Sequence, residues 1–272
     1  MTQIEKAQAF RALHAGADAF IIPNPWDAGS ARLLANLGFQ ALATTSAGFA
    51  FSLGRSDGAV SRDEVMAHIA ALAAATDLPV SADLENGFGH APEVAARAIT
   101  LASAAGAVGG SIEDATGQPN QPIYEIEAAV DRVRAAVEAA RALSFPFTLT
   151  ARCENYLVGR NDIADTILRL RAYQEAGADV LYAPGVATRE DIATVVTSVD
   201  RPLNVLMGLQ GVQLSRTELA ELGVRRISVG GSLARAALGA LLRAGREMRE
   251  QGTFTFAQEA ASFREISDMF AI

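Results

Sequence analysis

Short apolar segments rich in β-branched residues alternate along the chain with longer segments whose apolar residues recur every three or four positions. The longer segments are typical of amphipathic helices, and residues 27–38, 61–76 and 163–177 are clear examples. Glycines typical of helix C-terminal ends follow several of them, at Gly38, Gly106, Gly177 and Gly223. The short segments predict eight strands, at residues 19–22, 41–45, 79–84, 108–113, 147–152, 179–183, 203–207 and 226–229.

The repeated order of strand and helix predicts an α/β protein built from βα units. The phrases "NLGFQALATT", "EAGADVLYAP" and "ELGVRRISVG" each read as helix end, glycine and strand. Eight such strands in 272 residues predict a (β/α)8 TIM-type barrel, whose usual length is about 250 residues. An open doubly wound sheet is the alternative, and the lack of G-x-G-x-x-G after the first strand argues against it. We assign residues 1–250 to the barrel and 251–272 to a C-terminal helical extension of a single domain.

The C-terminal extension carries an apolar stripe that the barrel's own helices do not require. Phe263, Ile266 and Phe270 lie on one helical face. That face either covers the chain's own barrel or is swapped onto a neighbouring subunit. We therefore expect a homo-oligomer, and a tetramer if the family resemblance described below extends to assembly.

Charge and composition limit the classes of binding partner and the cellular compartment that we expect for this protein. The 31 acidic residues outnumber the 23 basic ones, so a general surface for nucleic acid or anionic membrane is not expected. The single cysteine, Cys153, excludes an internal disulfide and fits a reducing compartment. The start of the chain lacks the pattern of a signal peptide, and no apolar run approaches about 20 residues. These features predict a cytoplasmic protein.

Acidic residues stand where strands three and four end, which is where barrel enzymes carry their active sites. In the stretch "SADLENGFG", strand alternation predicts that Asp83 and Glu85 share a face and Leu84 points away. Glu113 and Asp114 follow the next strand and point to opposite sides. Hard carboxylate oxygens in this arrangement suit Mg²⁺, with Mn²⁺ as the substitute.

Two further strand ends carry candidate binding groups. After strand two, Ser46 is followed by Ala47 and Gly48, whose backbone N–H groups we expect to be accessible to a ligand. At strand five, Arg152 can bind a carboxylate or a developing oxyanion, or form an ion pair with Glu113. Cys153 takes the opposite strand face, so we predict that it packs against a helix. The glycines of "SVGGSLARA" are typical either of a phosphate site or of a tight turn.

These segments resemble the isocitrate lyase/phosphoenolpyruvate mutase superfamily, in the family's order along the chain. The segments are "NPWDAGSARLLANLGFQAL", "TTSAGFAFSLGRSDG", "SADLENGFG", "SIEDATG" and "TARCENYLVGR". The resemblance implies a Mg²⁺ site that binds a 2-oxo acid and makes or breaks a bond at its C3 carbon. It assigns carboxylate binding to Ser46, Ala47 and Gly48, the metal shell to Asp57, Asp83, Glu85 and Glu113, and the enolate to Arg152.

The sequence departs from this family in two places. The Lys-Lys-Cys-Gly-His loop of the isocitrate and methylisocitrate lyases is replaced by "DATGQPNQPIYEI", which holds no lysine, cysteine or histidine. The segment "YAPGV" lacks the Glu or His that relatives carry after strand six. Asn120, a metal-bound water or a substrate group is then the candidate acid, and residues 115–124 form the expected lid. The family's Asp-x-Asp reads Asp83-Leu84-Glu85 here, which leaves direct metal ligation by Glu85 open.

We expect a carbon–carbon lyase that acts through an enolate on a small 2-oxo or 2-hydroxy di- or tricarboxylate. Arg152, Glu113, Asp57 and Asn120 are its candidate catalytic residues. The candidate substrate-binding residues are Ser46, Ala47, Gly48, Asp83, Arg152 and Asn204, for a ligand of the pyruvate, oxaloacetate or 2-oxoglutarate type. Phosphorus–carbon chemistry on a phosphonate is the alternative, for which Arg55 and Arg160 would be the further cations. A silent 2-oxo acid binder and a ketopantoate hydroxymethyltransferase-like barrel rank lower.

Overall fold

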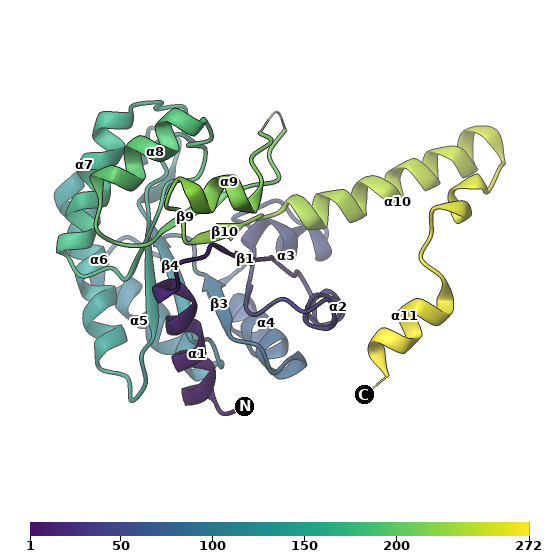
Figure 1. Ribbon diagram of the computed structural model, residues 1–272, viewed down its shortest axis with the longest axis horizontal. Helices are drawn as coiled ribbons and strands as arrows, with labels where there is room; N and C mark the ends of the chain where they lie inside the picture. The colour runs from purple at the N-terminus through teal and green to yellow at the C-terminus, as the bar shows by residue number, and fades with distance from the viewer. Residues whose placement is uncertain (211, 272) are drawn as a thin grey trace.

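Eight parallel strands form the centre of the computed structural model, which describes residues 1–210 and 212–271 (Figure 1). Their order in the sheet is β1-β10-β9-β8-β7-β4-β3-β2. The predicted (β/α)8 architecture and all eight predicted strands are confirmed. The strands are β1 (Phe20–Ile22), β2 (Leu42–Ala43), β3 (Val80–Asp83), β4 (Gly109–Glu113), β7 (Thr148–Arg152), β8 (Val180–Tyr182), β9 (Leu203–Leu206) and β10 (Arg226–Ser228).

The barrel closes between β1 and β2, the two strands at the ends of the sheet order. The backbone N–H of Ala43 donates to the carbonyl of Pro23 at 3.1 Å. Just above it, the side-chain amide of Asn24 donates to the carbonyl of Thr44 at 2.9 Å. The buried side chain of Asn24 thus supplies a hydrogen bond between β1 and β2 that the short backbone of β2 does not make.

Helices cover the outside of the barrel, and several begin at the side-chain caps that the sequence offers. Asp27 caps α2, and Ser61 forms a capping box with Glu64 at the start of α4. No helix in the described residues is long and apolar enough to cross a membrane. The helices are α1 (Gln3–Ala15), α2 (Ala28–Asn36), α3 (Ser46–Ser52), α4 (Arg62–Ala75), α5 (Pro92–Ala104), α6 (Ile126–Arg141), α7 (Ile163–Glu175), α8 (Arg189–Ser198), α9 (Arg216–Glu221), α10 (Ser232–Gln251) and α11 (Phe263–Phe270), with a 3₁₀ turn η1 (Thr255–Gln258).

Alternate strand residues face the barrel lumen and the surrounding helices. Ala82, Ile112 and Leu149 pack outward in a core that α5 and α6 complete. The lumen is closed from below by α1, because a Cβ at Gly109 would lie 2.7 Å from the ring of Phe10. Glycine at this position therefore allows Phe10 of α1 to pack into the lower end of the lumen. The opposite end of the barrel is the one left open for an active site.

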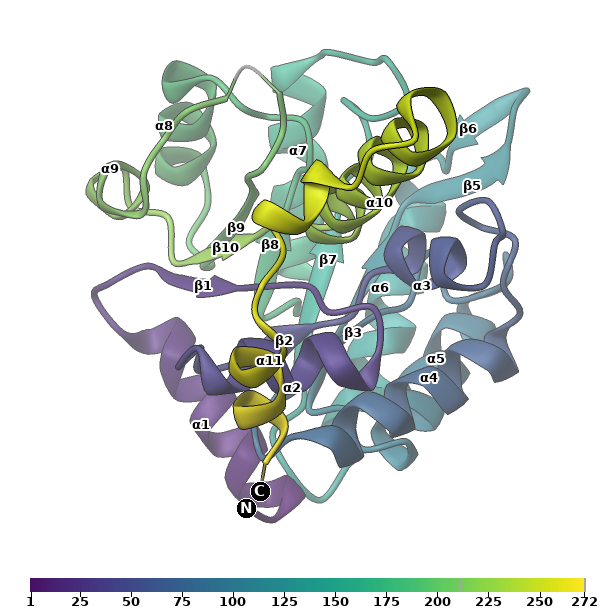
Figure 2. The ribbon, with the colours of Figure 1, turned by 90° about the vertical axis from the view of Figure 1, so that its right-hand side faces the viewer.

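The segment expected to form a lid is a β-hairpin. Strands β5 (Ala115–Gln118) and β6 (Gln121–Ile123) pair antiparallel and project from the barrel (Figure 2). The hydroxyl of Thr116 bonds the carbonyl of Gln121 across the hairpin. Closure of this hairpin over the site stays a prediction.

The C-terminal segment leaves the barrel as an arm. Of the residues of α10, only Ala234 is buried, and Figure 1 shows the helix projecting away from the strands. The chain then turns back, and α11 contacts α2, where the amide of Asn36 donates to the carbonyl of Met269. Phe263 is nonetheless 90% exposed. The predicted helix is confirmed, and its exchange between subunits stays a prediction.

Candidate active site

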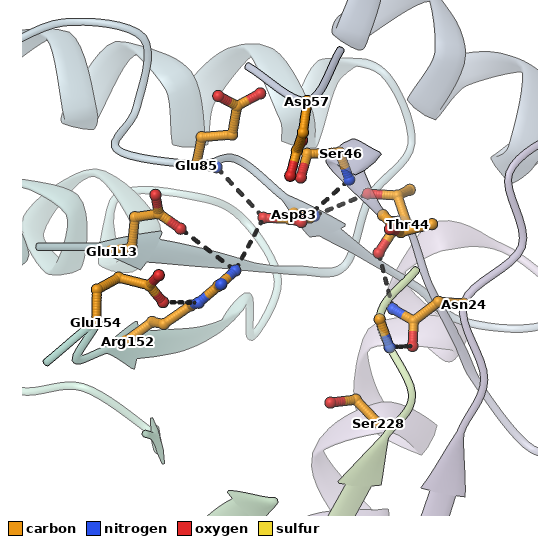
Figure 3. A network of polar contacts seen from close by, with 12 residues as sticks. Asn24, Thr44, Ser46, Asp57, Asp83, Glu85, Glu113, Arg152, Glu154 and Ser228 are labelled. Atoms are coloured by element: carbon orange, nitrogen blue, oxygen red, sulfur yellow. Dashed lines mark hydrogen bonds and ion pairs between the residues drawn. The ribbon is translucent and has the colours of Figure 1, made fainter. Parts of the chain in front are cut away.

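A cavity of about 280 Å³ opens at the C-terminal ends of the strands. Its wall combines the ends of β2, β3, β7 and β8 with the turn before α10, as the barrel prediction requires. Figure 3 shows several of its polar side chains converging. Of the residues singled out from the sequence, Ser46, Ala47, Asp57, Asp83 and Arg152 line this cavity.

Arg152 is the centre of a partly buried ion-pair network. Its Nη1 lies 3.3 Å from Oε2 of Glu113 and 3.7 Å from Oδ1 of Asp83. Its Nε donates to Oε1 of Glu154, and the Tyr182 ring centroid lies 5.2 Å from its Cζ. The ion pair with Glu113, one of the two readings of the sequence, is therefore present, and Glu154 is a partner that the sequence reasoning missed.

Asp83 links this network to the loop after β2. Its Oδ2 accepts a hydrogen bond from the backbone N–H of Ser46 at 3.1 Å. Its own N–H donates to the hydroxyl of Thr44 at 2.8 Å. The carboxylate is thereby fixed between the serine loop and Arg152, with an edge left on the cavity (Figure 3).

Glu85 does not lie where strand alternation predicted. Strand β3 ends at Asp83, and Glu85 has a φ of 48°, in the left-handed region. The rule that places alternate residues on one face therefore stops before Glu85. Figure 3 shows its carboxylate directed away from Asp83. Leu84, predicted to point away from the site, is fully buried.

Around Arg152 the acidic side chains outnumber the single guanidinium. Burial first, and then the charges of Asp83 and Asp57, together raise the pKa of Glu85 to about 7 against the opposing effect of Arg152. Burial also raises the pKa of Glu113 well above its ordinary value, against the opposing effect of Arg152. Burial disfavours the charged form of Arg152, but its carboxylate neighbours outweigh this and raise its pKa. One guanidinium thus leaves the acids under-compensated, which favours an added cation.

The fit to a metal ion depends on ligation through water. The described residues contain no group of three acidic, histidine or cysteine side chains arranged to hold an ion directly. Mg²⁺ commonly uses one or two carboxylates and several waters. Asp83 and Asp57 line the cavity, and Figure 3 shows Glu85 and Glu113 in the same network of polar side chains. This donor set fits an ion held by Asp83 with the other acids contacting its waters.

Gly48 differs from the sequence-based expectation of an accessible N–H. Its N–H donates to the Thr45 hydroxyl at 3.2 Å, as the N-cap bond of α3. A Cβ at this position would lie 2.6 Å from Cγ2 of Thr45. Gly48 therefore permits close packing beneath the loop, and Ser46 and Ala47 face the cavity.

The glycine-rich turn after β10 is not a free anion site. The N–H groups of Val229 and Gly230 both donate to Oδ1 of Asn24, at 3.0 and 2.9 Å. These are the donors that a phosphate would use. Of the two readings of this turn, the structure favours the tight turn.

Two residues assigned to substrate and acid roles lie outside the cavity wall. Asn204 is buried, and its amide donates to the hydroxyl of Ser228 at 2.9 Å, so Ser228 rather than Asn204 faces the cavity. Asn120 is exposed at the tip of the β5–β6 hairpin. The structure therefore supports neither direct substrate contact by Asn204 nor an acid role for Asn120 in this conformation.

Cys153 and the two extra arginines also lie elsewhere. Cys153 is 1% exposed in the core between barrel and helices, as predicted, and burial raises its pKa. Arg55 pairs with Glu64, and Arg160 pairs with Asp165.

The cations that do line the cavity, besides Arg152, are Arg226 and Arg235. The sequence reasoning missed both. Arg226 shares the lumen-facing period of Ser228, which is the signal that could have found it.

A (β/α)8 barrel with acids and a partly buried arginine at the C-terminal strand ends defines a barrel enzyme equipped to stabilise an oxyanion. The chain belongs to the phosphoenolpyruvate phosphomutase family, whose sequence profile matches residues 10–249. It is thus an enzyme of the isocitrate lyase/phosphoenolpyruvate mutase superfamily, as the sequence motifs indicated.

Three similar proteins place the chain within that superfamily. A crystal structure from Burkholderia cenocepacia J2315, provisionally described as a lyase or mutase, is 65% identical with a TM-score of 0.97, over 99% of this chain and 97% of that one. The oxaloacetate decarboxylase of Chromohalobacter salexigens is 29% identical over 248 residues, or 89% of this chain and 84% of the decarboxylase. Phosphonopyruvate hydrolase in complex with oxalate and Mg²⁺ is 25% identical with a TM-score of 0.86, over 99% and 95% of the chains.

Proposed function

We propose that the protein is a Mg²⁺-dependent carbon–carbon lyase that acts on a small 2-oxo dicarboxylate through an enolate, by decarboxylation of the oxaloacetate type. The observation that carries this proposal is Arg152, held among carboxylates at the cavity wall. Similarity to an oxaloacetate decarboxylase, and to a hydrolase whose structure contains oxalate and Mg²⁺, supports it.

Different residues of the cavity would bind the carboxylate, the developing oxyanion and the metal ion. Ser46 and Ala47 lie where the oxo acid's carboxylate would rest, and Arg152 would donate to the oxygen that becomes negative as the bond breaks. Asp83, assisted by Asp57, Glu85 and Glu113, would hold the ion. Bound Mg²⁺ would act as a Lewis acid toward the carboxylate and carbonyl oxygens of the ligand.

The lack of the lyases' cysteine, histidine and lysine from the hairpin favours decarboxylation over retro-aldol cleavage. The hairpin that replaces the lyase loop carries no cysteine, histidine or lysine. Retro-aldol cleavage of an isocitrate-type substrate leaves a carbanionic carboxylate fragment that an enzyme acid must protonate. Loss of CO₂ requires no protonation of the departing group, and solvent can protonate the pyruvate enolate afterwards.

The direct test is conversion of oxaloacetate to pyruvate and CO₂ in Mg²⁺ buffer, measured against an enzyme-free control because the metal alone catalyses slow decarboxylation. We expect turnover that EDTA abolishes and excess Mg²⁺ restores. Turnover that is unaffected by EDTA would refute the metal dependence. Absence of turnover on oxaloacetate, with cleavage of isocitrate or methylisocitrate, would refute the reaction type.

Phosphorus–carbon hydrolysis is the second candidate, because Arg226 and Arg235 line the cavity and could bind a phosphonyl group. Arg55 and Arg160, the cations expected from the sequence, do not line the cavity. Phosphate release from phosphonopyruvate, without decarboxylation of oxaloacetate, would favour it.

A further inference from the structure

Arg226 crosses the lumen of the barrel beneath the cavity. It is the first residue of β10, and its Nη1 donates to the hydroxyl of Thr150 on β7 at 3.0 Å. Since β8 and β9 lie between those two strands in the sheet, the side chain spans the barrel. It is 4% exposed and forms part of the cavity lining, and its Nε is buried with no hydrogen-bond partner.

The charge of this guanidinium is not compensated by the protein. Among the described residues, no carboxylate lies within ion-pair distance of Arg226, whereas Arg152 has three. Burial lowers the pKa of Arg226 to about 10, so the group remains charged at neutral pH. His14 is neutral beside it, because burial and Arg226 itself lower the pKa of His14 to about 3. A buried charge without a partner is costly and is uncommon without a ligand to satisfy it.

The space around Arg226 is open to a small ligand. Ser81, Ser111 and Ser228 line the same cavity and are the small lumen-facing residues of β3, β4 and β10. Their short side chains leave room that larger residues would fill, and their hydroxyls can share an anion with the guanidinium.

We propose that Arg226 forms a second anion subsite, at the floor of the cavity, that binds the distal carboxylate of a dicarboxylate ligand. This subsite makes the enzyme selective for substrates with two carboxylates over pyruvate-like monocarboxylates. The inference rests on the proposed function for the other end of the ligand, which the serine loop, Arg152 and the metal would hold.

The experiment compares two stable 2-hydroxy acids that differ by one carboxylate, L-lactate and L-malate, together with pyruvate. Affinities are measured by calorimetry with Mg²⁺ for the wild type, Arg226→Gln and Arg226→Lys. We expect the wild type to bind malate about 10- to 100-fold more tightly than lactate, which is the value of one charge-assisted bond. Arg226→Gln should lose this preference and keep its affinity for lactate and pyruvate, and Arg226→Lys should keep part of it.

Thermal melts separate a ligand role from a structural one. Glutamine can still donate to Thr150, so removal of the uncompensated charge should leave the melting temperature unchanged or raise it. A marked fall in melting temperature, with the preference for malate retained, would overturn the proposal. Loss of pyruvate binding along with malate binding in Arg226→Gln would also overturn it.

A second measurement uses the wild type alone and is independent of how the variants fold. A crystal structure with Mg²⁺ and L-malate should place one carboxylate within hydrogen-bond distance of Arg226, and a carboxylate elsewhere would refute the subsite. If the wild type binds pyruvate but prefers lactate to malate, the subsite fails and the proposed function stands. If it binds none of the three acids, both fail.

Discussion

Replacement of Arg152 by lysine tests whether this residue holds the substrate or only the fold. The guanidinium directs Nε to Glu154 and Nη1 to Glu113 and Asp83. Its Nη2 makes no ion pair within the described chain, and the side chain lines the cavity, so Nη2 is the donor left for a ligand. A lysine has one nitrogen and no planar fork, so it cannot serve both carboxylate sides and the ligand.

The expected loss follows from the bond that the ligand would forfeit. One charge-assisted hydrogen bond is worth about 1.5–3 kcal/mol, which corresponds to an affinity or rate lower by about 10- to 100-fold. We expect Arg152→Lys to show this loss for pyruvate binding and for turnover of oxaloacetate. Arg160→Lys is the matched control, because Arg160 pairs with Asp165 on the surface and does not line the cavity.

Calorimetry with Mg²⁺ and thermal melts, run on both variants, distinguish the two roles. A structural Arg152 would give near-native pyruvate affinity in a protein of lower melting temperature. That result would refute the assignment of Arg152 to the substrate. Equal losses in Arg152→Lys and Arg160→Lys would refute it as well.

Three further predictions concern the metal, the pH dependence of stability and the assembly. Asp83→Ala should abolish calorimetric Mg²⁺ binding in the presence of pyruvate, and undiminished affinity would remove Asp83 from the metal site. The ring of His68 stacks on that of Phe49 with centroids 3.8 Å apart, and burial lowers the pKa of His68 to about 4. Because this is below the unfolded value of about 6.5, the neutral histidine contributes its whole share of the free energy of unfolding above pH 6.5. That free energy falls as the pH drops from 6.5 towards 4, by at most about 1.4 kcal/mol per pH unit. Urea unfolding at pH 7 and 5 should show a smaller loss in His68→Phe, and an equal loss would contradict this. Light scattering should show a homo-oligomer, because α10 and Phe263 are exposed along the arm, and a monomer at micromolar concentration would refute the assembly.

The fold and half of the site could be predicted because both follow from strand periodicity. Asp83, Glu113 and Arg152 are the last residues of their strands, so the barrel rule alone brings them together. Glu85 could not be placed in this way, because its positive φ depends on how the loop after β3 packs. Glu154 also lies beyond its strand, and its N–H is held by Asp114, a contact between residues 40 positions apart.

Arg226 illustrates a different limit of sequence reasoning. In "GVRRIS" two adjacent arginines stand at the start of the strand, and the composition does not show which faces the lumen. The register does, since Arg226 pairs with Asn204 and shares the face of Ser228. A buried charge at a strand start contradicts the usual pattern of apolar strands, and such local conflicts are typical of functional positions.

The two ends of the cavity carry opposite imbalances of charge, and this argues for one composite ligand. At the mouth, burial raises the pKa values of the carboxyls of Glu85 and Glu113, and the neighbouring acids raise them further against the opposing effect of Arg152. At the floor, Arg226 has no acidic partner among the described residues. A cation alone would relieve the first imbalance, and a free anion alone would relieve the second. A divalent cation bound together with a dicarboxylate would relieve both, so Mg²⁺ and malate should raise the melting temperature together by more than the sum of their separate effects.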